Sequence, residues 1–77
     1  MSNYYDENHK MHQWIRKIAA AIKKGNIARR DTIVYDALSN FKVSERSVNK
    51  AIDMMVIVEN FQEDYGSGTI SKGEGNE

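Results

Sequence analysis

Apolar residues recur at helical spacing in three segments of the 77-residue chain. The stripe of the first segment is formed by Met11, Trp14, Ile15, Ile18, Ala21 and Ile22. Steps of three and four residues place these side chains on one face of an amphipathic helix. The pattern predicts a helix over residues 8–24, with Asn8 as the N-cap and Gly25 as the stop after the last turn.

Two further helices follow from the same periodicity. The second stripe consists of Ile33, Val34, Ala37, Leu38 and Phe41. It predicts a helix over residues 32–40 with Asp31 as its N-cap. The third stripe consists of Val48, Ala51, Ile52 and Met55, and Ser44 precedes it as N-cap. We expect this third helix to end between residues 58 and 60, because the β-branched residues 56–58 can extend a helix or begin a strand.

The segments between and after the helices favour turns and short strands. Residues 26–30 fit either a short edge strand or a plain loop. Residues 61–72 surround the turn Gly66-Ser67-Gly68 and predict a β-hairpin. Phe61 and Ile70 are the residues expected to point inward.

The composition is that of one small folded domain, with 40% apolar and 29% charged residues. We expect the domain over residues 9–72, between a flexible N-terminal segment at residues 1–8 and a disordered acidic tail at residues 73–77. The chain has no cysteine and no basic and apolar leader, which makes the cytoplasm the default location. Its strongest apolar run, residues 54–58, is too short to cross a bilayer, so no membrane partner is expected.

Charge is distributed unevenly, although the formal net charge is zero. Residues 9–50 carry ten Lys and Arg against three Asp and Glu, whereas residues 51–77 carry one Lys against six acids. Such a division predicts one basic face on the folded protein.

The order of helix, helix, short turn, helix and hairpin resembles a winged helix-turn-helix, and the sharpest part of the resemblance is residues 43–52. In that family an apolar turn residue, a Ser or Thr cap and apolar residues five, eight and nine positions after the turn hold the recognition helix in place. The residues at these positions are Val43, Ser44, Val48, Ala51 and Ile52. The resemblance implies an α+β, mainly helical fold with three helices and a C-terminal β-hairpin, similar to small regulators of phages, archaeal viruses and plasmids.

The resemblance also implies sequence-specific binding to double-stranded DNA and a role in transcription regulation. The recognition helix, at about residues 44–58, would enter the major groove as part of a homodimer. Arg46, Asn49 and Lys50 would read bases, because Asn pairs with adenine and Arg or Lys with guanine. The other candidate DNA contacts, mainly to phosphates, are Arg29, Arg30, Lys42, Ser44 and Ser47. An ordinary solvated helix face would carry the same residues.

Other functions receive less support from the sequence. A winged-helix module that binds proteins and not DNA is the main alternative, given the acidic C-terminal third and the apolar residues 56–58. RNA binding is weaker, because no exposed aromatic platform is evident. No nucleophile motif or third ligand beside His9 and His12 points to an enzyme or a metal site, and no cofactor or small-molecule ligand is expected. Glu63 and Asp64 predict a short wing that stays peripheral to DNA.

Overall fold

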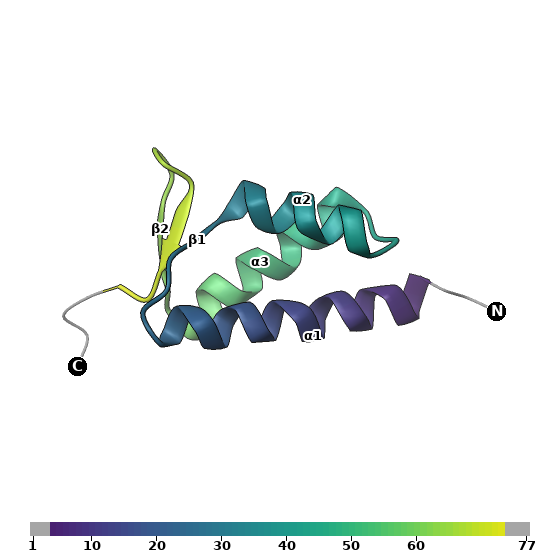
Figure 1. Ribbon diagram of the computed structural model, residues 1–77, viewed down its shortest axis with the longest axis horizontal. Helices are drawn as coiled ribbons and strands as arrows, with labels where there is room; N and C mark the ends of the chain where they lie inside the picture. The colour runs from purple at the N-terminus through teal and green to yellow at the C-terminus, as the bar shows by residue number, and fades with distance from the viewer. Residues whose placement is uncertain (1–3, 74–77) are drawn as a thin grey trace.

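The computed structural model describes residues 4–73, excluding the side chains of Tyr4 and Tyr5, and forms an α+β domain that is mainly helical. Its elements are α1 (Tyr4–Lys23), β1 (Ala28–Arg29), α2 (Arg30–Asn40), α3 (Glu45–Glu59), β2 (Gln62–Asp64) and β3 (Thr69–Ser71) (Figure 1). The predicted set of three helices and a C-terminal hairpin is thus confirmed, and β1 adds a third strand.

Helix α1 begins at Tyr4, so the predicted N-cap at Asn8 is wrong and residues 4–8 are helical. Two features explain the earlier start. Asp6 and Glu7 fall in the first turn, where negative charge complements the helix dipole. Glu7 Oε1 also accepts a hydrogen bond from the backbone N–H of Lys42 at 2.9 Å, which anchors this turn to the α2–α3 connection.

The end of α1 follows the prediction. Gly25 has φ 110° and donates its N–H to the carbonyl of Ile22 at 2.9 Å. A residue with a side chain would be strained at this φ, which explains the glycine after the last turn.

Helix α2 begins at Arg30 without a side-chain cap, so the prediction that Asp31 is the N-cap is wrong. Strand β1 runs directly into the helix, and the backbone N–H of Arg30 bonds to the carbonyl of Gly68 in the hairpin turn at 2.9 Å. The hairpin turn therefore satisfies one of the free N–H groups at the start of α2.

Helix α3 has both predicted ends. Ser44 is the N-cap, and its side chain accepts the backbone N–H of Ser47 at 3.0 Å. The helix runs through residues 56–58 to Glu59, and Asn60 adopts the left-handed conformation at φ 59°. The β-branched run thus extends the helix.

The sheet is antiparallel with strand order β1-β3-β2. Its register places Ile70 of β3 between Ala28 of β1 and Glu63 of β2. Residues 26–30 therefore contribute a short edge strand, one of the two predicted alternatives. Ile70 is fully buried and Phe61 is 9% exposed, which confirms the predicted inward pair.

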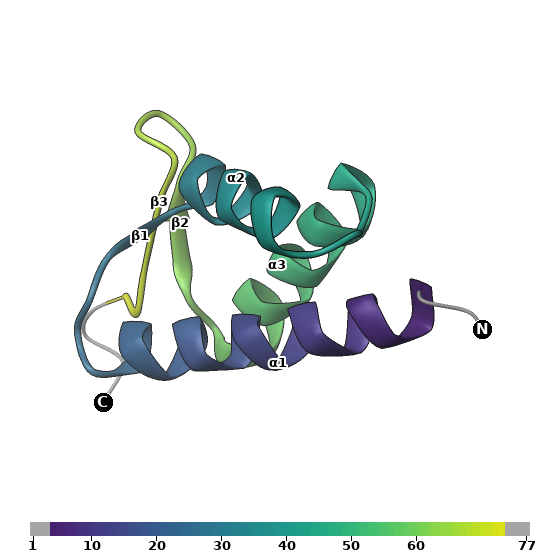
Figure 2. The same cartoon turned by 45° about the vertical axis from the view of Figure 1, so that its right-hand side comes forward.

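The core lies where the three helices and the sheet meet (Figures 1 and 2). Helix α3 runs between α1 and α2, and the sheet closes the end at which α1 finishes (Figure 2). Every predicted stripe and the inward hairpin pair contribute buried residues, and Ala19, which was in no predicted stripe, is buried as well. The buried residues are Met11, Ile15, Ala19, Ile22, Ile33, Ala37, Val48, Ala51, Ile52, Met55, Phe61 and Ile70. Trp14 packs on Phe41 with ring centroids 5.7 Å apart, which joins α1 to the end of α2.

Two further expectations from the sequence concern the acidic tail and membrane crossing. Residues 74–77 of the predicted acidic tail lie outside the described residues. Between residues 4 and 73 no helix combines the length and the apolar character needed to cross a bilayer.

Candidate nucleic-acid interface

The first half of α3 presents two cations to solvent. Arg46 and Lys50 are exposed and lie one turn apart on the same side of the helix. Neither side chain forms an ion pair or hydrogen bond with another residue in the described part of the chain. Like charges four residues apart destabilise an isolated helix slightly, and an anionic partner would remove that cost. Both of these predicted site residues are therefore available to a partner.

Two serines lie at the start of the same helix. Ser44 Oγ accepts the N–H of Ser47 and donates to Ser47 Oγ, each at 3.0 Å. The Ser44 hydroxyl is therefore committed to the cap, whereas the Ser47 hydroxyl keeps its own hydrogen for a further acceptor. Lys42, two residues before the cap, is exposed, and its side chain has no bonded partner in the described part of the chain, although its backbone N–H is bonded.

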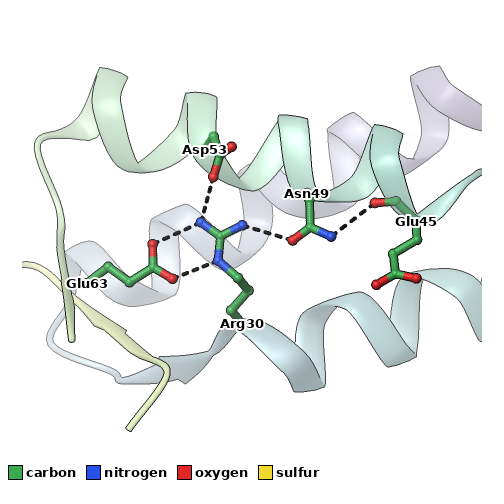
Figure 3. Close-up of polar contacts among 5 residues, drawn as sticks. All are labelled: Arg30, Glu45, Asn49, Asp53 and Glu63. Carbon is green, nitrogen blue, oxygen red and sulfur yellow. Dashed lines mark hydrogen bonds and ion pairs between the residues drawn. The ribbon is translucent and has the colours of Figure 1, made fainter. Parts of the chain in front are cut away.

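Arg30 has a different environment from the one the sequence suggested. Its guanidinium donates from Nε to Glu63 Oε2 at 2.6 Å and from Nη2 to Glu63 Oε1 at 2.9 Å (Figure 3). Nη2 also donates to Asp53 Oδ1 at 2.7 Å, and Nη1 donates to Asn49 Oδ1 at 2.9 Å. We call these four residues, Arg30, Asn49, Asp53 and Glu63, the Arg30 cluster.

The cluster connects three elements, since Arg30 begins α2, Asn49 and Asp53 lie on α3, and Glu63 lies on β2. The Glu63 side chain is only 5% exposed and that of Arg30 is 22% exposed. Hydrogen bonds from the guanidinium to Glu63 raise the pKa of Arg30, so it stays charged at any accessible pH. A bidentate pair at this burial holds the hairpin against the helices.

Asn49 is bonded at both ends of its amide. Its Oδ1 accepts from Arg30, and its Nδ2 donates to the backbone carbonyl of Glu45 at 3.2 Å. A base contact by Asn49 or a phosphate contact by Arg30 would require these bonds to break. The structure therefore gives both residues a role in joining elements, where the sequence had suggested DNA contacts.

Arg29 is more accessible than Arg30. It pairs with Asp31 at 3.3 Å, and both side chains are more than half exposed. The hydrogen bond from Arg29 lowers the pKa of the Asp31 carboxyl. Exposed ion pairs of this kind contribute little to the stability of the fold and break easily. Arg29 is therefore available to a phosphate.

The second half of α3 is apolar at the surface. Met54, Ile57 and Val58 are 55%, 73% and 70% exposed, whereas Val56 packs against the core. The spare apolar surface expected from residues 56–58 is thus present at two of the three positions, and Met54 enlarges it. An ion pair of 2.9 Å between Lys23 and Glu59 ties the ends of α1 and α3 together beside this patch.

The hairpin is short, as expected, with three residues in each strand. Its acids have structural partners. Glu63 belongs to the Arg30 cluster, and Asp64 Oδ1 accepts the N–H of Gly66 at 2.9 Å within the turn. These partners do not make either acid attractive to a phosphate.

Sequence reasoning missed the Arg30 cluster because its members are distant along the chain. Arg30 and Glu63 are 33 residues apart, and the pairing of both β1 and β2 with β3 brings them together. The one local signal was the i, i+4 spacing of Asn49 and Asp53. Among the residues described, His9 and His12 belong to no group of three or more side chains able to hold a metal ion.

Comparison with known proteins adds no relative. No family model, no curated protein and no solved structure matches the chain.

Proposed function

We propose that the chain is a winged helix-turn-helix protein that binds double-stranded DNA sequence-specifically and regulates transcription. Three helices with a three-stranded antiparallel sheet are compatible with that fold. The observation that carries the proposal is a pair of exposed cations, Arg46 and Lys50, on the helix that follows the Ser44 cap; neither has a partner among residues 4–73.

The proposed contacts fall into two groups. Arg46 and Lys50 reach base edges in the major groove, because Arg and Lys donate to guanine O6 and N7. Arg29 and Lys42 are exposed cations outside α3 and bind phosphates. The Ser47 hydroxyl, in the first turn of α3, adds a phosphate contact that the helix dipole favours. Of the eight residues that the sequence suggested as DNA contacts, six remain DNA contacts or, for Ser44, the helix cap. The other two, Arg30 and Asn49, belong to the Arg30 cluster.

A homodimer is part of the proposal. One recognition helix of this size reads only a few base pairs, so specificity requires two copies. The exposed patch of Met54, Ile57 and Val58 offers apolar surface for the contact between copies.

The test begins with selection of duplexes from a random-sequence pool by the full chain. The affinity of the best duplex is then measured by fluorescence anisotropy for the parent and for the Arg46→Ala/Lys50→Ala variant. Each lost base contact is expected to cost about 1–3 kcal/mol on the selected site and little on random DNA.

The matched control is Lys17→Ala/Lys24→Ala, which removes the same charge from exposed positions on α1 and its end. It should retain sequence preference. Equal losses in the two double variants would show that only net charge matters, and the base-reading assignment would then be abandoned.

A protein-binding module without DNA binding remains the alternative function. It is favoured by the exposed residues Tyr35, Leu38 and Tyr65, which line one groove that Arg46 and Lys50 do not line. Failure of the selection to enrich any duplex would favour this alternative.

A further inference from the structure

A groove of about 520 Å³ lies between α2, α3 and the hairpin. Val34, Tyr35 and Leu38 line it from one face of α2, and Tyr65 lines it from the hairpin turn. Its volume is within the range of pockets that hold small organic ligands. Arg46 and Lys50 do not line it, although Glu45 and Asn49, which precede them on α3, do.

Large side chains that line the groove are exposed to solvent. Tyr65 is 86% exposed, Tyr35 is 71% exposed and Leu38 is 42% exposed. Tyrosine rings with accessible faces attract cations, because the face of the ring carries partial negative charge. The apolar lining and the two rings therefore suit a ligand that combines an apolar body with a positive charge.

The charged residues that line the groove are mostly negative, which suits a positively charged ligand. Three are acids, Asp31, Glu45 and Glu63, against one cation, Arg30. Arg30 is neutralised by the cluster, Glu63 is engaged by Arg30, and Asp31 pairs with Arg29. An anion entering the groove would therefore meet net negative charge.

Glu45 supplies the free carboxylate. It is exposed, and its side chain has no bonded partner among the residues that the structure describes. Figure 3 shows the Glu45 carboxylate pointing toward α2, apart from the guanidinium of Arg30. The same groove thus contains a free carboxylate, two aromatic rings and an aliphatic wall.

We propose that this groove binds a small organic cation with an apolar body. The cationic group pairs with Glu45, and the apolar body lies on Val34 and Leu38 beside the rings of Tyr35 and Tyr65. This site goes beyond DNA binding, and it departs from the sequence-based expectation that no small-molecule ligand is bound. Its lining residues are spread over positions 30–68, so no local sequence motif could predict the site.

The probes are three compounds with the same phenylbutyl body, namely 4-phenylbutylammonium, 4-phenylbutanol and 4-phenylbutyrate. Each is titrated into the isotope-labelled full chain without DNA, and amide shifts are followed by NMR. The ammonium compound is expected to shift the amides of Val34, Tyr35, Leu38, Glu45 and Tyr65. It should bind at least tenfold more tightly than the alcohol, and the carboxylate should bind most weakly.

Two variants separate charge from apolar contact. Glu45→Gln should weaken the ammonium compound about two- to fivefold, as an exposed ion pair allows, and leave the alcohol unchanged, whereas Tyr35→Ala should weaken both. The control is Asp36→Asn, which removes the same charge on α2 outside the groove. Unchanged amide dispersion shows that each variant is folded.

Three results would each overturn the proposal: shifts that map elsewhere, equal affinity for ammonium and alcohol, or unchanged ammonium affinity in Glu45→Gln. Because no DNA is present in these titrations, their outcome is independent of whether the chain binds DNA.

Discussion

Replacing Arg30 with methionine should destabilise the fold strongly, although Arg30 looks like a surface residue in the sequence. The change removes all four hydrogen bonds of the Arg30 cluster and keeps most of the aliphatic length. Glu63, which is 5% exposed, would be left as a carboxylate without its cation.

The expected magnitude follows from the burial of each partner. Hydrogen bonds to charged groups contribute about 1.5–3 kcal/mol each, and removing one partner of a fully buried pair costs about 3–5 kcal/mol. Asp53 is 61% exposed and adds little. Since Arg30 is 22% exposed, we expect the free energy of unfolding to fall by about 3 kcal/mol. For a domain of this size that corresponds to a drop of about 12–24 °C in Tm.

The assay is urea denaturation followed by the fluorescence of Trp14, with a second unfolding curve from circular dichroism. Arg29→Met is the matched control, because it breaks an exposed pair next to the cluster and should change the free energy of unfolding little. The double variant Arg30→Met/Glu63→Leu replaces both charges with apolar groups and should recover about 2 kcal/mol of the loss.

The reasoning is refuted if Arg30→Met is no more destabilising than Arg29→Met. It is also refuted if the losses of the Arg30→Met and Glu63→Leu single variants simply add in the double variant.

The remaining predictions concern the cap, the amide and the apolar patch of α3. Ser44→Ala should lower the free energy of unfolding by about 1 kcal/mol in the same urea assay, and no change would mean that the cap is dispensable. Asn49→Ala should cost about 1 kcal/mol of stability but leave the DNA preference of the selected duplex intact, whereas a changed preference would return Asn49 to the base-reading set. Sedimentation should show a dimer at micromolar concentration that Ile57→Asp makes monomeric, and a parent that stays monomeric over a hundredfold concentration range would exclude the patch as an interface.

The helices could be predicted from the sequence because their signals are local. Spacings of three and four residues located the buried faces, and Ser44 located the start of α3. The start of α1 was predicted too far along the chain, because Asn8 is a typical N-cap residue, whereas Asp6 and Glu7 stabilise an earlier first turn. The start of α2 was missed because the hairpin, and not a side chain, satisfies the N–H of Arg30.

The candidate site could be predicted only in part. Exposure of Arg46 and Lys50 follows from helical periodicity, because both lie opposite the buried stripe of Val48, Ala51 and Ile52. The partners of Arg30 depend on the register of the sheet, which short strands and a glycine turn do not specify along the sequence. Charge counting alone cannot separate a cation that is engaged inside the fold from one that is free.

The salt dependence of binding to a selected duplex tests the DNA proposal most directly. With Arg29, Lys42, Arg46 and Lys50 exposed, the logarithm of the affinity should fall linearly with the logarithm of salt concentration, with a slope of about −0.9 for each phosphate neutralised. Arg29→Ala should reduce that slope by about 0.9 on selected and random duplexes alike. Absence of salt-sensitive DNA binding by the parent chain, at concentrations where it is folded, would contradict the proposal.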